Sequence, residues 1–213
     1  IWDGYCDSEV PVSKEEFRQS YVMAERELAK VRHILPHHNF YDLLLIKMRI
    51  ELGDLVARQV LAADYPVEPK AEAIARYCYD AARSSIEEAR PTLEALYARY
   101  PMVLVSNFYG NVESVLSDFD VRKYFGTIVE SAVVGVRKPD PKIFALGVEA
   151  LGLKPEEVVD VLKIYQTFDP ILKREPLPHS PLNDEAKLVW QRYSNEAPEV
   201  LTTTVERLKE YFA

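Results

Sequence analysis

The sequence has 213 residues, of which 48% are hydrophobic, so the chain can build a substantial core and wholesale disorder is excluded. Its net charge of −8 argues against a nucleic-acid groove or an anionic membrane surface as the main partner. A small anionic substrate remains compatible with that charge. Two distant cysteines suggest neither a disulfide framework nor a zinc site, and no stretch resembles a signal peptide or a bilayer span. A cytoplasmic protein is therefore expected.

The first hundred residues are predicted to be almost wholly helical. Asp3-Gly4 is typical of a turn. Ser13 and Glu16 form a capping box, which predicts a helix that continues to about Val31. Further apolar periodicity predicts helices over residues 40–63 and 70–90, and Pro91 is expected to start another helix that runs to residue 100.

The middle of the chain alternates between strand and helix patterns. A short apolar run, residues 102–105, ends in Ser106-Asn107 and is typical of a buried parallel strand. After Gly110 a helical stripe begins at Val112. A second strand is predicted over residues 127–134, followed by a loop that carries Lys138, and then by a helix over residues 142–151.

These patterns set one hydroxyl and one lysine at the ends of two core strands. Ligands bind at the carboxyl edge of open parallel sheets, and the start of the helix near Val112 is expected to offer free N–H groups. Ser106 and Lys138 therefore predict an anion site. Both residues also have a simpler interpretation, Ser106 as a helix cap and Lys138 as a solvated surface lysine. Asn111, in the turn after Ser106, either binds a ligand or only supports the turn.

The last part of the chain carries weaker patterns. Residues 158–161 resemble a core strand, whereas four prolines in residues 170–181 favour a loop. Residues 200–202 and 205–212 are predicted to form an edge strand and a closing helix. The change from helical to alternating patterns places a domain boundary near residues 84–90.

Three segments, VLVSN, VGVRKPDPKIF and GLKPEEVV, together resemble the haloacid dehalogenase-like hydrolases, which are mostly phosphatases that act through a phospho-aspartate. The resemblance implies an α/β fold, with a Rossmann-like three-layer core, a parallel sheet and an inserted helical cap. It implies a residual core segment at residues 1–10, a cap at residues 11–84 and the core at residues 85–213. The implied activity is Mg²⁺-dependent hydrolysis of a small phosphate monoester.

The resemblance also implies roles for individual residues. Ser106 matches the strand-end hydroxyl that binds a phosphoryl oxygen, and the backbone N–H of Asn107 is expected to help hold that oxygen. Lys138 matches the lysine that offsets the charge of the nucleophile and the phosphoryl group. Asp160 is a candidate Mg²⁺ ligand, although no glycine precedes it as in the family motif. Asn111 is a further candidate for substrate binding.

The sequence departs from the family at the nucleophile, because no Asp-x-Asp motif occurs near its start. Asp3-Gly4 is only a superficial echo of it. We therefore expect the nucleophile to lie outside these residues. Two alternatives stay open: a non-catalytic relative that binds a phosphorylated ligand or a protein partner, and a dehalogenase that needs no metal. Neither the substrate nor the oligomeric state is indicated.

Overall fold

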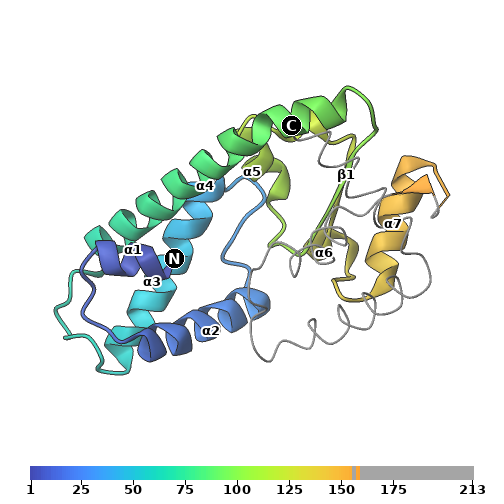
Figure 1. Ribbon diagram of the computed structural model, residues 1–213. Coiled ribbons are helices and arrows are strands. Elements are labelled where there is room, and N and C mark those ends of the chain that lie inside the picture. The colour runs from blue at the N-terminus through green and yellow to red at the C-terminus, as the bar shows by residue number, and fades with distance from the viewer. Residues whose placement is uncertain (155–156, 159–213) are drawn as a thin grey trace, which may run out of the picture. The chain divides into compact units, whose positions relative to one another are not determined.

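A computed structural model of the protein describes residues 1–154 and 157–158. The first 155 residues form one compact unit. Its elements follow one another from a helical segment into a short sheet with helices around it (Figure 1). No helix in this part of the chain is long and apolar enough to cross a membrane.

The helical segment begins with α1 (Trp2–Asp7), α2 (Lys14–Lys30) and α3 (Phe40–Ala57). The capping box predicted for α2 is confirmed, because the Ser13 hydroxyl accepts the N–H of Glu16 and the Glu16 carboxylate accepts the N–H of Ser13. The turn predicted at Asp3-Gly4 is wrong, since both residues lie within α1. A Cβ on Gly4 would lie 3.2 Å from Ile74, so this glycine permits close packing of α1 against the long helix that contains Ile74.

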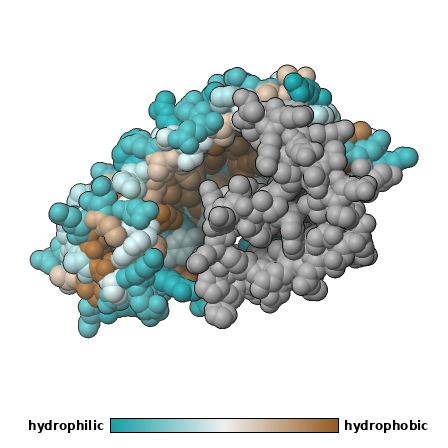
Figure 2. Space-filling view, in the orientation of Figure 1, coloured by the Kyte–Doolittle hydropathy of each residue, from teal (hydrophilic) through white to brown (hydrophobic). Residues whose placement is uncertain are grey.

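That helix, α4 (Val67–Tyr97), is a single element of 31 residues with Pro91 inside it. The prediction of two helices separated at Pro91 is therefore wrong. Side chains on both sides of the proline, Ile86 and Leu93, pack against the same hydrophobic cluster, which holds the helix together across the missing N–H donor. The upper edge of Figure 2, where α4 runs in Figure 1, is mostly hydrophilic.

The described sheet consists of two parallel strands, β1 (Val103–Ser106) and β2 (Thr127–Glu130), as the sequence predicts. Between them lie α5 (Val112–Asp118) and the 3₁₀ turn η1 (Arg122–Tyr124). The prediction that the second strand continues to residue 134 is wrong, because residues 131–134 form the short helix α6 (Ser131–Val134). The helix α7 (Pro141–Leu151) packs on the sheet, with Gly147 against Val105.

Two hydrophobic clusters stabilise this unit. The first lies among α1, α2, α3 and the first half of α4, and the second among α5, η1 and the second half of α4. Three aromatic residues, Phe40, Tyr79 and Phe108, pack against both clusters. The strand predicted at residues 158–161, apart from Val158, and the strand predicted at residues 200–202 lie outside the described residues, so the fuller Rossmann-like core and the cap remain expectations.

Candidate functional site

The ends of β1 and β2 form the edge at which the anion site was predicted. Their parallel register pairs Ser106 with Glu130, the last residue of each strand, so the two strands end at the same edge of the sheet. Ser106 thus occupies the strand end that the sequence assigns to it.

Lys138 is joined to this edge through Asn107. The Lys138 N–H donates to Asn107 Oδ1 over 2.8 Å, and Asn107 Nδ2 donates to the Lys138 carbonyl over 3.0 Å. The Lys138 ammonium also donates to the carbonyl oxygen of Val105, 3.0 Å away and one residue before Ser106. The structure therefore brings Asn107 and Lys138 together beside Ser106, although their roles toward a phosphoryl group stay predictions.

The turn before α5 is occupied by a carboxylate of the protein itself. Glu130, which is buried, accepts the N–H of Gly110 over 2.5 Å and the N–H of Val112 over 3.3 Å. A negative charge is favourable at a helix start, and here it is supplied from β2. The prediction of free N–H groups at this helix start is wrong for these two donors.

Asn111 is almost fully buried and links the turn to the helical segment. Its Nδ2 donates to the carbonyl of His38 over 3.0 Å, whereas its buried Oδ1 has no hydrogen-bond partner within the described part of the chain. The contact with His38 supports the structural interpretation of Asn111. Its predicted role in substrate binding is not tested by this contact.

Sequence reasoning missed a polar group next to the site. Tyr109, three residues after Ser106, donates its hydroxyl to both carboxylate oxygens of Glu25 on α2, over 3.0 and 2.9 Å. Glu25 also forms an ion pair with Lys47 on α3, whose side chain is 5% exposed. Burial and the neighbouring Glu25 raise the pKa of the Tyr109 hydroxyl, which therefore remains a donor. The signal in the sequence that could have indicated Tyr109 is its position only three residues after Ser106.

A second buried polar contact lies within the helical segment. The Tyr5 hydroxyl donates to Glu51 Oε2 over 2.9 Å, and Glu51 Oε1 lacks a hydrogen-bond partner among the described residues. Burial raises the pKa of Glu51 to about 7, although the positive charge of Lys47 acts in the opposite direction.

Asp160, the predicted metal ligand, lies outside the described residues. Within those residues, no three His, Cys, Asp or Glu side chains are grouped so that they could hold a metal ion.

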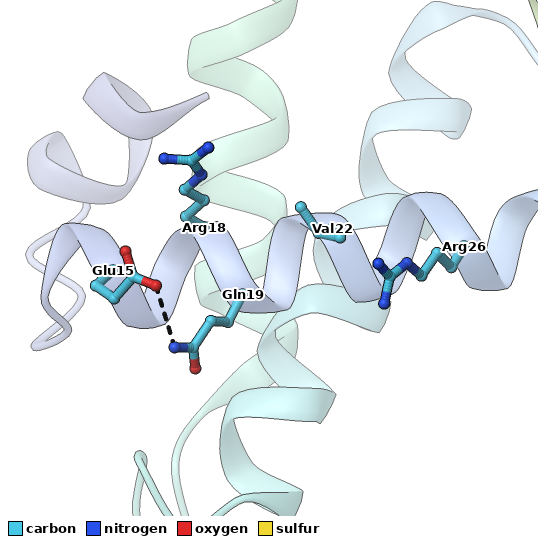
Figure 3. A pocket seen from close by; sticks show the side chains of 5 residues that line it. All are labelled: Glu15, Arg18, Gln19, Val22 and Arg26. Carbon is cyan, nitrogen blue, oxygen red and sulfur yellow. Dashed lines mark hydrogen bonds between the residues drawn. The ribbon is translucent and has the colours of Figure 1, made fainter. Parts of the chain in front are cut away.

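Two surface hollows lie away from the strand ends. One is lined by residues of α2 alone (Figure 3), with Gln19 Nε2 donating to Glu15 over 3.2 Å. The other lies along α7, between Phe144 and Leu153. Neither contains Ser106, Asn107 or Lys138 among its lining residues.

Comparisons with known proteins support the motif-based interpretation. A family model described as a haloacid dehalogenase-like hydrolase matches residues 3–161. One similar curated protein is Acyl-CoA dehydrogenase family member 10 from Mus musculus, which is 40% identical over 57 residues. That match covers 27% of this chain and only 5% of the mouse protein. No solved structure matches the chain.

Proposed function

This chain belongs to the haloacid dehalogenase-like hydrolases, and from that membership we propose that it cleaves a small phosphate monoester with the help of Mg²⁺. In this proposal Ser106 and the N–H of Asn107 hold phosphoryl oxygens, and Lys138 offsets negative charge. Phosphoryl transfer depends mainly on positioned donors and cations, so these groups supply the appropriate chemistry. The helical residues 11–84 form the cap that selects the substrate.

The single observation that carries the proposal is the position of the Lys138 side chain. Its Nζ lies 3.0 Å from the carbonyl of Val105, at the end of the strand that carries Ser106. The paired hydrogen bonds between Asn107 and the Lys138 backbone hold this loop to the strand end. A cation fixed at this edge is suited to a dianionic phosphate.

Two parts of the proposal rest on family membership rather than on contacts. Members of the family generally use Mg²⁺, and Asp160 is the residue that we propose as a ligand. The nucleophilic aspartate is assigned to no residue of this sequence, because no Asp-x-Asp motif occurs near the start. Loss of turnover in EDTA, and its return with added Mg²⁺, would support the metal requirement.

The test compares Lys138→Ala with Lys142→Ala in the full-length protein. We expect the first change to lower kcat/KM for p-nitrophenyl phosphate by about 100-fold or more, because it removes a cation aimed at developing charge. The two hydrogen bonds between Asn107 and Lys138 use the Lys138 backbone, which the substitution keeps, so the fold is expected to survive. Lys142 is exposed on α7 and is the matched control, with turnover expected to stay unchanged. Retained activity in Lys138→Ala would refute the role of this lysine.

A second function to test is binding of a phosphorylated ligand or a protein partner without catalysis. Such a protein would be stabilised by inorganic phosphate in thermal unfolding while showing no turnover with Mg²⁺. A metal-independent dehalogenase would instead release halide from a halocarboxylate in the presence of chelator. These three assays distinguish a phosphatase, a phosphate-binding protein and a dehalogenase.

A further inference from the structure

Residues 107–111 and Val112, the first residue of α5, form a segment, called here the 107–112 loop, in which every residue hydrogen-bonds to a distant part of the chain. On one side, its partners are residues 130–138: the backbone of Lys138, the hydroxyl of Ser131 and the carboxylate of Glu130. On the other side, its partners are Glu25 and the carbonyl of His38, both in the helical segment. The 107–112 loop is therefore a junction between the sheet and the helices.

Tyr109 makes the polar contact from this loop to α2. Its hydroxyl lies 3.0 and 2.9 Å from the two oxygens of Glu25, which is 84 residues away in the sequence. Hydrogen bonds to a charged acceptor are about twice as strong as neutral ones. The raised pKa of Tyr109 keeps this donor protonated across the physiological range.

Glu25 is in turn held by Lys47. The lysine is buried, its ammonium pairs with the Glu25 carboxylate, and it lies 3.9 Å from the centre of the Tyr21 ring. A buried ammonium requires such a partner, so the position of Glu25 is fixed by α3 as well as by α2. The acceptor that Tyr109 uses is thus presented by two packed helices rather than by a loose surface side chain.

We propose that Glu25, held by Lys47, is a positioning residue that fixes the 107–112 loop through Tyr109 and thereby sets the affinity of the strand-end site for phosphate. The affinity part of this inference rests on the proposed phosphatase function; the positional part does not. Because the loop begins directly after Ser106, a shift of Tyr109 displaces the N–H of Asn107 relative to Ser106. The helical segment then controls how well a phosphoryl group is held.

The experiment uses Tyr109→Phe, which removes one hydroxyl and leaves the ring. We expect KM for p-nitrophenyl phosphate to rise by about 3- to 10-fold with kcat within about twofold, which is less than the full loss of a hydrogen bond to a charged group, because Tyr109 acts on the site only through Asn107. Amide hydrogen exchange of the 107–112 loop should become faster, by about tenfold, while that of α7 stays unchanged. In a Glu25→Ala/Lys47→Met background, which lacks the acceptor, the same Tyr109 change should have a much smaller effect.

Ser114→Ala is the matched control. It removes another hydrogen bond to the helical segment, from the Ser114 hydroxyl to the Pro36 carbonyl over 2.6 Å, but it lies outside the loop. We expect this control to leave both KM and loop exchange unchanged.

The outcomes separate the two proposals. Unchanged loop exchange in Tyr109→Phe overturns the link. Faster exchange with an unchanged KM shows a structural contact only, and overturns the affinity role. If the wild-type protein neither turns over p-nitrophenyl phosphate nor binds inorganic phosphate, the proposed function fails and the affinity role fails with it. Loop exchange in Tyr109→Phe still decides the positional link in that case.

Discussion

Glu51 is the buried residue whose charge state has the clearest consequence for stability. It is fully buried and accepts a hydrogen bond from the Tyr5 hydroxyl. The charges of Lys47 and Glu25 also act on the pKa of Glu51, and the charge of Glu51 acts on the pKa of Cys78. Burial raises its pKa from the ordinary 4.5 to about 7. Between these pH values the folded state binds a proton that the unfolded state releases, so the free energy of unfolding decreases as the pH rises.

We therefore expect Glu51→Gln to remove much of the pH dependence of stability. The wild-type protein should lose on the order of 3 kcal/mol between pH 4.5 and pH 8 from this group, whereas a neutral amide contributes no such slope. Urea unfolding at several pH values would measure the effect. Glu72→Gln, at an exposed position on α4, is the control and should retain the wild-type slope. Identical slopes for wild type and Glu51→Gln would contradict the prediction.

The residues that carry the predicted chemistry were accessible from the sequence, whereas their contacts were not. Ser106 directly follows an apolar run, and Lys138 lies in a loop between a glycine and a proline. Both patterns are local and can be recognised in the sequence. The contact between Tyr109 and Glu25 joins residues that are 84 positions apart, and no local periodicity encodes it. The capture of the turn at Gly110 by Glu130 likewise depends on strand register, which a single sequence does not specify.

At the scale of elements, α7 depends on close contact with β1. A Cβ at Gly147 would lie 2.7 Å from Val105 Cγ2, and the branched valine side chain has few alternative rotamers. Gly147→Ala is therefore expected to destabilise the protein by about 1–3 kcal/mol, despite the better helix propensity of alanine.

Gly53→Ala is the control for that change. Gly53 lies in α3, and outside the helix's own backbone no atom of the described residues lies within 4 Å of the position that its Cβ would take. This substitution should stabilise the protein by up to about 1 kcal/mol. Thermal unfolding of both variants gives the comparison, and equal shifts in Tm would argue against close packing at Gly147.

Element types were predicted more accurately than element boundaries. The parallel strands and the helix α7 were predicted because apolar runs and an amphipathic pattern mark them locally. The continuity of α4 was missed because proline usually ends a helix, whereas here contacts on both sides of Pro91 override that preference. The helix α6 was mistaken for the end of a strand because its two valines favour a strand locally. Val133 is 73% exposed, so it does not pack as a residue of a buried strand would.

At the scale of the whole compact unit, shared aromatic residues join the two hydrophobic clusters. The Phe119 ring, which belongs to the second cluster, lies 5.5 Å from Phe40 and 5.4 Å from Tyr79, measured between ring centres. Phe40 begins α3 and Tyr79 lies in α4, so the loss of this ring affects both clusters.

Phe119→Ala should lower the free energy of unfolding by about 3–5 kcal/mol and accelerate amide hydrogen exchange in both α3 and α5. Tyr97→Ala is the control, because this residue is 54% exposed and its ring packs against Tyr124 of the second cluster. That change is expected to cost about 1 kcal/mol or less. Faster exchange confined to α5 in Phe119→Ala would indicate that the two clusters unfold independently.

The continuity of α4 also restricts how this protein can vary in length. The helix supplies Ile74 to the first cluster and Ile86 to the second, and one turn contains 3.6 residues. Inserting a single residue between them would rotate one half of the helix by about 100° relative to the other, so that one apolar stripe would face water. Homologous chains are thus expected to tolerate insertions in the connections around α4 rather than within it.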